Sequence, residues 1–524
     1  MKKLAYLSVF FFLFTAELRS YSTNPDSVLV NSSILFYSNL SLMNEWSLSA
    51  NPAGFNFYRL NSISQVQLGV DYSKENLKWA QAPGKTQEFY VNTTGLKKVG
   101  KLMFNGRFEY KNSRYNDLMY NNLLEFDNRN IYIMGDTIDG RQKKEGFTMS
   151  GGASYPVTGR LLVGINLDYG VYQGAKMRDP RNLNKIVNLI VTPGLIYQLN
   201  DMYIGVSGGI IRSKNEVEID VMLDSKHNLF QFLGLGYFQV ERNISYYEAL
   251  YENNGYSASV QLDIKKEKWT FFQSLGYTVL SNEVRKGTSY KLLDGITDLK
   301  RYEYSGYAIF RGRSLYHQIN TNVSSEEIKG TEVEQHTVSV YNGYYYRDSI
   351  VTDRRVEDKH IIKDINGMVE YRLSKLGSSA PFKYHFTAGV NARYYKVDHY
   401  PVEDYGYYKT STLLGYLSYQ RWFHFTFADF APTIGAKYRK AFTNEMDYNI
   451  IADKFFAEIP EVDYQYLTSD YYMGEVDLTL LKPMPTNFIK EYFFNIKGSY
   501  MYIQDLPSGN NYNFMVHVSA GITF

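Results

Sequence analysis

Long stretches of strict alternation between apolar and polar residues constrain this chain more than any other feature. In the last thirteen residues, 512–524, the even positions are apolar or aromatic, and the odd positions are polar or small except for Met515. A period of two places these two sets on opposite faces of a β-strand. The same rule holds in 64–72, 160–172 and 382–394, where the apolar face begins at Phe382.

The length of these stretches separates two fold classes. Strands of soluble sandwiches usually have about 5–6 residues, whereas a strand that crosses a bilayer at a tilt needs about 9–11. The alternation here runs over nine to thirteen residues and has aromatic ends, like the aromatic girdles of outer-membrane proteins. We therefore predict an all-β fold, a transmembrane antiparallel up-and-down β-barrel surrounded by outer-membrane lipid.

The connections alternate between short and long, as expected for tight periplasmic turns and long external loops. The short connections lie near 156–160, 199–201, 265–268 and 311–313, and the long ones near 114–143, 221–253, 328–355 and 443–463. Both chain ends should be periplasmic, which requires an even number of strands.

Eighteen strands is our best count, and 14 and 16 stay open because two hairpins are weak. The predicted strands are 61–73, 85–96, 100–113, 144–157, 159–175, 185–199, 201–220, 254–265, 267–287, 298–311, 314–328, 356–375, 382–399, 406–420, 422–442, 465–483, 490–505 and 511–524. The apolar stretch 227–240 would upset this parity as a strand. We predict that it belongs to a long external loop with a short helix or an inward fold; an ordinary wall strand is the alternative.

The N-terminal residues have the pattern of a secretory signal peptide. Lys2 and Lys3 precede an apolar stretch that ends at Ala16 and is too short to span a membrane as a helix. We predict a signal peptide over 1–22 with cleavage after Ser22; cleavage after Ala16 or Ser20 stays open. Residues 61–524 then form the barrel. The intervening segment, 23–60, lacks sustained alternation, and we predict that it folds inside the lumen as a hatch.

Motifs for catalysis or cofactor binding are missing from the sequence. There is no cysteine, no phosphate-binding G-x-x-x-x-G-K-[ST] loop and no H-E-x-x-H pair. The stretch GDTIDG (135–140) does not match a calcium loop and is predicted to be a polar external turn. In 344–355, aromatics beside arginines are predicted to be an interface girdle that runs into a charged loop; a stacking platform for a sugar or nucleotide is the alternative. A net charge of +2 gives no attraction for nucleic acid. We expect no enzyme activity and no cofactor.

The residues SLSANPAGFNFYRLNSISQVQLGVDY resemble the start of the barrel in the long-chain fatty-acid transporter family of outer-membrane proteins. In that family, an Asn-Pro-Ala-Gly-like motif follows an N-terminal hatch and leads into the first strand, and Asn51, Pro52, Ala53 and Gly54 match it. The resemblance covers about 25 residues. The rest of the chain looks like Tyr-rich outer-membrane barrels of Bacteroidota whose function is unknown. The resemblance implies fourteen strands, a plugged lumen and passage of hydrophobic molecules.

We expect an outer-membrane channel or transporter, porin-like in wall and lumen, in a Gram-negative envelope. Uptake would be passive, with a small hydrophobic or amphipathic ligand and the hatch as gate. The residues Asn51–Gly54 would form the turn that connects the hatch to the first strand of the barrel. The terminal Phe524 is predicted to be the signal for the barrel-assembly machinery. The alternative is an accessory barrel that acts with a secretion or receptor protein in the outer membrane.

Overall fold

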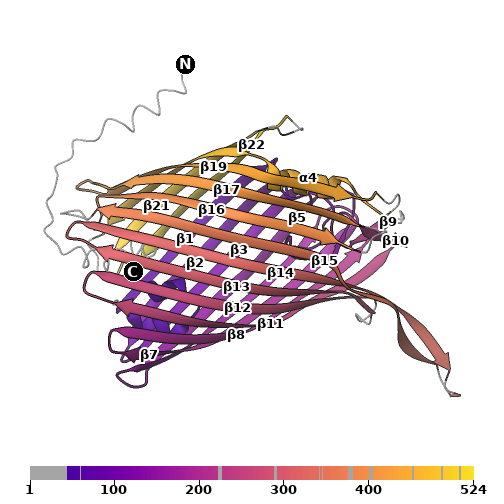
Figure 1. The fold of residues 1–524 in the computed structure, drawn as a ribbon, viewed down its shortest axis with the longest axis horizontal. Coiled ribbons are helices and arrows are strands. Elements are labelled where there is room, and N and C mark those ends of the chain that lie inside the picture. The colour runs from indigo at the N-terminus through magenta and orange to yellow at the C-terminus, as the bar shows by residue number, and fades with distance from the viewer. Residues whose placement is uncertain are drawn as a thin grey trace.

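Eighteen antiparallel strands close into a barrel in the computed structural model (Figure 1). The structure describes residues 44–58, 61–221, 227–287, 292–341, 343–344, 346–375, 382–400, 405–450, 454–484, 488–504, 506 and 509–524. The first strand pairs with the last from Gln65 opposite Thr523 to Glu75 opposite Asn513, which closes the wall.

The wall strands follow one another in chain order. They are β1 (Ser62–Glu75), β2 (Lys85–Val99), β3 (Leu102–Leu118), β5 (Gly140–Pro156), β6 (Leu161–Lys176), β7 (Arg181–Leu199), β8 (Met202–Asp220), β11 (Tyr246–Lys265), β12 (Trp269–Lys286), β13 (Leu292–Arg311), β14 (Leu315–Tyr341), β15 (Tyr346–Lys375), β16 (Tyr384–His399), β17 (Gly406–Arg421), β19 (Asp429–Tyr448), β20 (Tyr471–Pro483), β21 (Glu491–Ile503) and β22 (Tyr512–Thr523). The two-residue β18 (Phe423–His424) pairs only with β19.

Each of the eighteen predicted strands corresponds to one wall strand, so the preferred count is confirmed. The fourteen strands implied by the fatty-acid transporter resemblance differ from this number. Most boundaries agree within a few residues, because the period-two signal is local. Two strands start later than predicted, β19 at Asp429 rather than 422 and β20 at Tyr471 rather than 465. Two start earlier, β11 at Tyr246 rather than 254, within the predicted loop 221–253, and β13 at Leu292 rather than 298.

The predicted loop 328–355 is wrong. Strands β14 and β15 continue as a hairpin from Glu332 to Val356, past the points where their outer neighbours stop pairing, at Glu332 for β13 and His360 for β16. This hairpin projects beyond the rim at the lower right of Figure 1. Polar residues on both faces concealed it, since no buried face enforces alternation there.

The outer face of the wall carries large apolar side chains. Leu68, Val390 and Leu417 are each about half exposed, at 50%, 47% and 55%, and each lies on the apolar face of its alternating strand. A contiguous apolar surface of this extent is costly in water and fits the hydrocarbon region of a bilayer. Phe382 is an exception to the predicted outward face: it precedes β16, is fully buried and packs on His385.

A charge introduced on this outer face is expected to destabilise the barrel. Val390 lies at the middle of β16, so Val390→Arg should lower the free energy of unfolding in lipid vesicles by about 2–4 kcal/mol. The neighbouring Asn391 points to the opposite face, and Asn391→Arg should change stability much less. Chemical denaturation of the folded protein in vesicles measures both. Equal effects of the two substitutions would contradict a lipid-facing wall.

The two ends of the barrel differ. At one end, called the turn end, the connections 100–101, 157–160 and 200–201 are short, and β1 begins and β22 finishes there. At the other, the loop end, longer segments carry further elements: β4 (Ile133–Gly135), β9 (His227–Phe232), β10 (Phe238–Ile244) and α4 (Glu458–Thr468). Strands β10, β9 and β4 form a separate small sheet. The stretch 227–240 therefore folds inward, and the alternative of a wall strand is wrong.

The N-terminal segment contributes two short 3₁₀ helices, η1 (Glu45–Leu48) and η2 (Pro52–Phe57). The signal peptide and the first part of the predicted hatch, through residue 43, lie outside the described residues. Within the described ranges, no helix is long and apolar enough to cross a membrane.

Candidate functional site: a lumen with a plug at each end

Trp46 anchors the described part of the N-terminal segment, residues 44–58, to the inner wall. Its side chain is 1% exposed, stacks on Phe57 with ring centroids 5.5 Å apart, and meets Phe272 of β12 edge-on at 5.2 Å. The indole Nε1 donates to Asp263 Oδ2 at 2.9 Å. We call residues 44–58 the turn-end plug, since their wall contacts lie near the turn end of each strand.

A cluster of charged side chains around Lys265 of β11 supports this anchor. Lys265 forms ion pairs with Glu45 and with Asp263, the latter at 3.3 Å. Burial on its own would raise the pKa of the Glu45 carboxyl, but the charge and hydrogen bond of Lys265 hold that pKa below its ordinary value. Sequence reasoning missed Trp46, Glu45 and their partners. A tryptophan within the non-alternating segment before the first strand, in a chain with four tryptophans, was the available signal.

Asn51 joins the two helices of the turn-end plug to three wall strands. Its Oδ1 accepts from the Ala53 N–H at 3.1 Å, the contact of a helix N-cap. Its Nδ2 lies 3.1 Å from the Leu195 carbonyl oxygen, 3.2 Å from that of Val206 and 3.0 Å from Gln261 Oε1. The side-chain amide of Asn51 therefore forms hydrogen bonds both within the plug and with the wall.

The other members of the predicted turn have distinct packing roles. Pro52 takes the first helical position, where its missing N–H costs nothing. Ala53 is fully buried. A side chain at Gly54 would begin 2.6 Å from Trp46 Cβ, so glycine is required by close approach. Asn51, Pro52, Ala53 and Gly54 thus lie inside the lumen as part of the plug.

Glycines on the wall form a cradle for this plug. A Cβ at Gly164 would lie 2.5 Å from Ala53 N, one at Gly194 2.2 Å from Asn51 Oδ1, and one at Gly205 2.5 Å from the Trp46 ring. These glycines stand on the inward faces of β6, β7 and β8. The sequence showed them only as small residues opposite an apolar face.

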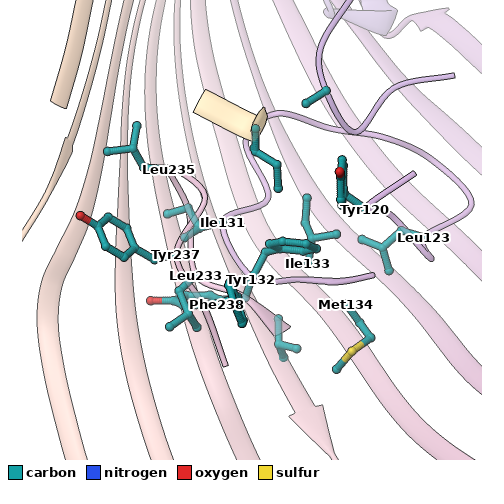
Figure 2. Packing of buried hydrophobic residues seen from close by; sticks show 14 of the residues in the cluster. Tyr120, Leu123, Ile131, Tyr132, Ile133, Met134, Leu233, Leu235, Tyr237 and Phe238 are labelled. Carbon is teal, nitrogen blue, oxygen red and sulfur yellow. The ribbon is translucent and has the colours of Figure 1, made fainter. Parts of the chain in front are cut away.

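A second plug fills the loop end. It consists of residues 119–139 and 227–245 together with α4, and we call it the loop-end plug. Figure 2 shows side chains of its first two segments side by side against the wall. Tyr132, Ile133, Met134 and Phe232 are each at most 3% exposed. They pack with inward residues of the wall from β8 to β17: Val217, Ile219, Tyr247, Ala249, Tyr251, Val284, Leu299, Ile328, Ile362, Tyr395, Val397 and Tyr408.

Residues 119–139 cross the lumen from β3 to the opposite wall. Asn130 Oδ1 accepts from Asn282 Nδ2 of β12 at 3.2 Å, and a Cβ at Gly295 of β13 would lie 2.5 Å from the Tyr132 ring. A cavity of about 50 Å³ within the plug has room for one or two waters. The part of the plug around Tyr132 is therefore a packed core, whereas an open pocket of about 640 Å³ lies beside residues 121–129.

An ion pair fixes the end of this crossing segment. Lys176 Nζ lies 2.7 Å from Asp136 Oδ1, with the two side chains 4% and 2% exposed. Lys176 also donates to the Ile138 carbonyl oxygen at 2.8 Å. The prediction of a polar external turn at 135–140 is therefore wrong for Asp136: a buried cation from β6 holds its carboxylate inside. The same pairing argues against a calcium role for this carboxylate.

The helix α4 docks through a partly buried carboxyl. Asp463 Oδ1 accepts from the Ala80 N–H at 2.8 Å. Burial raises the pKa of the Asp463 carboxyl to about 7, although the Ala80 hydrogen bond and the charge of Lys78 oppose the rise. Near neutral pH this carboxyl therefore changes charge while it holds the helix.

We expect the docking of α4 to weaken as the pH rises. An undocked, hydrated Asp463 releases its proton near pH 4, whereas the docked one keeps it until about pH 7. The docking free energy should therefore fall across this window and level off above it. Hydrogen exchange of 458–468, corrected for intrinsic rates, should be faster at pH 8 than at pH 5, and Asp463→Asn should remove the difference. Protection that increases with pH would contradict this account.

Between the plugs, the inner wall is polar and charged. Many of its ionic side chains are paired across neighbouring strands or with a residue two positions away. Examples are Arg393–Asp364 at 2.8 Å, Lys437–Glu475 at 2.7 Å, Lys111–Glu88 at 2.9 Å and Arg301–Glu326 at 3.1 Å. Such a surface suits water and polar groups.

One polar cluster at the β1–β22 seam has the composition of a catalytic triad. His517 Nδ1 lies 2.6 Å from Asp71 Oδ1, and its Nε2 lies 3.1 Å from Ser519 Oγ. However, Ser519 is 2% exposed, and the Tyr90 ring lies over Gly69, its partner across the seam. Strand β22 is paired on both sides here, so its amides offer no oxyanion site. The cluster ties the seam and lacks the parts of a hydrolase.

The remaining sequence-predicted residues lie apart from the plugs. Phe524 pairs with Ser64 through its backbone N–H at 2.9 Å, and its ring meets Phe488 at 5.0 Å; its role as an assembly signal stays a prediction. Tyr344, 93% exposed, lies at the tip of the projecting hairpin, away from the wall. The predicted interface girdle at 344–355 is therefore wrong. Among the described residues, no group of three or more His, Cys, Asp or Glu could hold a metal ion.

Comparison at the family level matches residues 52–524 to DUF6850, a family of unknown function. The chain belongs to this family. The match of this DUF6850 member starts at Pro52, within the turn-end plug, and includes the whole barrel. A search of curated proteins finds no match.

Solved structures that resemble the DUF6850 chain are barrels of low identity. The ferric preacinetobactin receptor BauA from Acinetobacter baumannii is 6% identical, with 88% of this chain and 79% of that chain covered and a TM-score of 0.38. The RagAB peptide transporter is 8% identical, with 88% of this chain and 86% of that chain covered and a TM-score of 0.41. OpdK from Pseudomonas aeruginosa, solved with vanillate, is 7% identical, with 88% of this chain and 98% of that chain covered and a TM-score of 0.34. Values this low say nothing about ligand or mechanism.

Proposed function

We propose that this protein is an outer-membrane channel or transporter whose lumen is closed at both ends by segments of its own chain. The observation that carries the proposal is the pair of plugs, each packed on the inner wall, with a polar lumen between them. The apolar outer face supports a place in the membrane, and both ends of the barrel chain at the turn end support a periplasmic position for that end.

The contacts of the two plugs favour gating by displacement. The turn-end plug is held by hydrogen bonds, one tryptophan and a small ion-paired group, which can separate from the wall without unfolding any strand. These contacts support the proposal that a hatch lies within 23–60. The ligand would pass along a lumen wall that is mostly polar, with apolar side chains at the plugs, which suits a small amphipathic molecule and passive uptake.

Releasing both plugs is expected to open the lumen. Liposomes with the wild-type protein should be nearly impermeable to small sugars, and a variant with Gly164→Ala, Gly194→Ala and Asp136→Ala should admit them at least about tenfold faster. Light scattering after an osmotic step measures the flux, and a shift in electrophoretic mobility on boiling confirms the folded barrel. A triple variant that folds yet stays as impermeable as the wild type would defeat the proposal.

The accessory role has one observation in its favour. The hairpin formed by β14 and β15 projects past the rim and exposes Val340, Tyr341 and Tyr344 at 51%, 58% and 93%. An exposed ribbon with unpaired edges suits a protein partner in the outer membrane. Deletion of residues 334–354 should then remove a partner that co-purifies in fixed ratio, without altering the flux of the plug-released variant.

A further inference from the structure

A pocket of about 220 Å³ opens on the inner face of the wall beside α4. Residues from β1, β19, β20, β21 and β22 line it, together with Leu77 and Tyr466 of the loop end. Arg439 is its only cationic lining residue and Glu75 its only acidic one. The pocket lies where the lumen meets the loop-end plug, beside the contact of Arg439 with the end of α4.

Arg439 is a fixed cation without a carboxylate partner among the described residues. Its Nε donates to the Ser469 carbonyl oxygen at 3.0 Å, and its Nη2 donates to the carbonyl oxygens of Tyr466 and Ser469, both at 2.7 Å. The Tyr471 ring centroid lies 4.5 Å from the guanidinium carbon. These contacts hold the group in place and leave Nη1 with no acceptor in the described part of the chain. A guanidinium held in this way is suited to an incoming carboxylate.

Three methionines form an apolar patch next to this cation. Met473 stands directly opposite Met501, and Met515 stands opposite Ser499, one pair further along. Further along the inward face the strands carry polar residues such as Glu475 and His517, and buried apolar residues return towards the barrel ends, at Leu481, Phe493 and Ile503. Met515, the exception in the alternation of the last strand, is 44% exposed. Flexible thioether side chains make adaptable apolar binding surfaces. Met501 also packs against the small apolar cluster of Leu77, Ile503 and Leu506, whereas packing does not account for the exposure of Met515.

The volume of the pocket and the charges around it limit the ligands that it can bind. Pockets for drug-sized ligands have about 300–1,000 Å³, so 220 Å³ suits a smaller molecule. Glu75 lies on β1, four strands from β19 in the closed sheet, which corresponds to roughly 19 Å at about 4.8 Å per strand. Its charge therefore does not oppose a carboxylate at Arg439.

We infer that this pocket binds a small monocarboxylate with an apolar body. The carboxylate pairs with Arg439, and the body packs on Met473, Met501 and Met515. The inference rests on the proposed function, since it gives the channel a binding station and a substrate class.

Calorimetry with the full-length protein in detergent tests this assignment. The probe 3-phenylpropanoate should bind measurably, acetate at least about tenfold more weakly because it lacks the apolar body, and phenethylamine more weakly still. Arg439→Gln should weaken binding of 3-phenylpropanoate by at least about tenfold, the loss expected for a charge-assisted hydrogen bond. Glu75→Gln should leave it within about threefold.

A second variant avoids the contacts of Arg439 with the helix end. Met515→Trp adds bulk inside the pocket and should abolish binding of 3-phenylpropanoate, whereas Asn322→Trp, on an exposed inward position of β14, should not. Binding that persists in both Arg439→Gln and Met515→Trp, a preference for phenethylamine, or no binding at all would overturn the inference. Liposome flux is measured separately: pocket binding without flux in the plug-released variant would reject the channel alone, and flux without binding would reject the pocket alone.

Discussion

Adding one methyl group to the wall at each of Gly164 and Gly194 is expected to displace the turn-end plug. The new Cβ atoms would lie 2.5 Å from Ala53 N and 2.2 Å from Asn51 Oδ1, far inside contact distance, and the neighbour at Gly164 is backbone that cannot swing aside. Overpacking costs about 1–3 kcal/mol at each site. Because every 1.4 kcal/mol is a factor of ten, the undocked population should rise at least about tenfold.

The absence of native cysteine makes this displacement measurable. Ala53 of the plug is fully buried and lies against Gly164 of the wall, so an Ala53→Cys background should react with a water-soluble maleimide only when the plug leaves the wall. In the Ala53→Cys background, the variant with Gly164→Ala and Gly194→Ala should react at least about tenfold faster than the protein that keeps both glycines. Gly276→Ala is the matched control, because that inward glycine has its nearest neighbour at an ordinary 3.7 Å. Equal labelling rates in both would show that the cradle does not hold the plug.

The wall could be predicted strand by strand because its signal is local. Each strand faces lipid on one side and the lumen on the other, and this writes a period of two into the sequence wherever the strand crosses the membrane. The signal fails where that constraint ends. The hairpin beyond the rim has solvent on both faces, and the start of β20 follows a helix whose residues 465–468 do not alternate.

The plugs could not be predicted in the same way, because distant parts of the chain create them. Asn51 meets Val206 and Gln261, and residues 119–139 lie against strands that follow more than a hundred residues later. A non-alternating segment with Trp46 indicated that something occupies the lumen, but not which wall residues receive it. Asp136 looked like part of a polar turn because its partner, Lys176, is recognisable only once the segment is folded inward.

Removing the carboxylate of Asp136 is expected to release the loop-end plug. Asp136→Ala leaves the Lys176 ammonium, 4% exposed, without its ion-pair partner. Breaking a buried pair in this way costs about 3–5 kcal/mol, mostly from the charge left behind. Tryptic cleavage after Arg129, which lies within the crossing segment, should therefore become about a hundredfold faster or more under native conditions. The time course of this one fragment on a gel measures the change.

Replacing both Asp136 and Lys176 tests whether the unpaired charge, rather than the loss of the ion pair itself, releases the segment. Asp136→Leu with Lys176→Met removes the orphaned charge and should recover most of the protection, but not all, because the Ile138 carbonyl oxygen then loses the Lys176 hydrogen bond. Cleavage as fast as in Asp136→Ala would show that the carboxylate acts some other way. The proposed function has the two plugs close the lumen in series, so Asp136→Ala by itself should speed cleavage without raising liposome flux. Flux should appear only when the glycine pair is substituted as well, and an increase with either change alone would mean that a single plug closes the lumen.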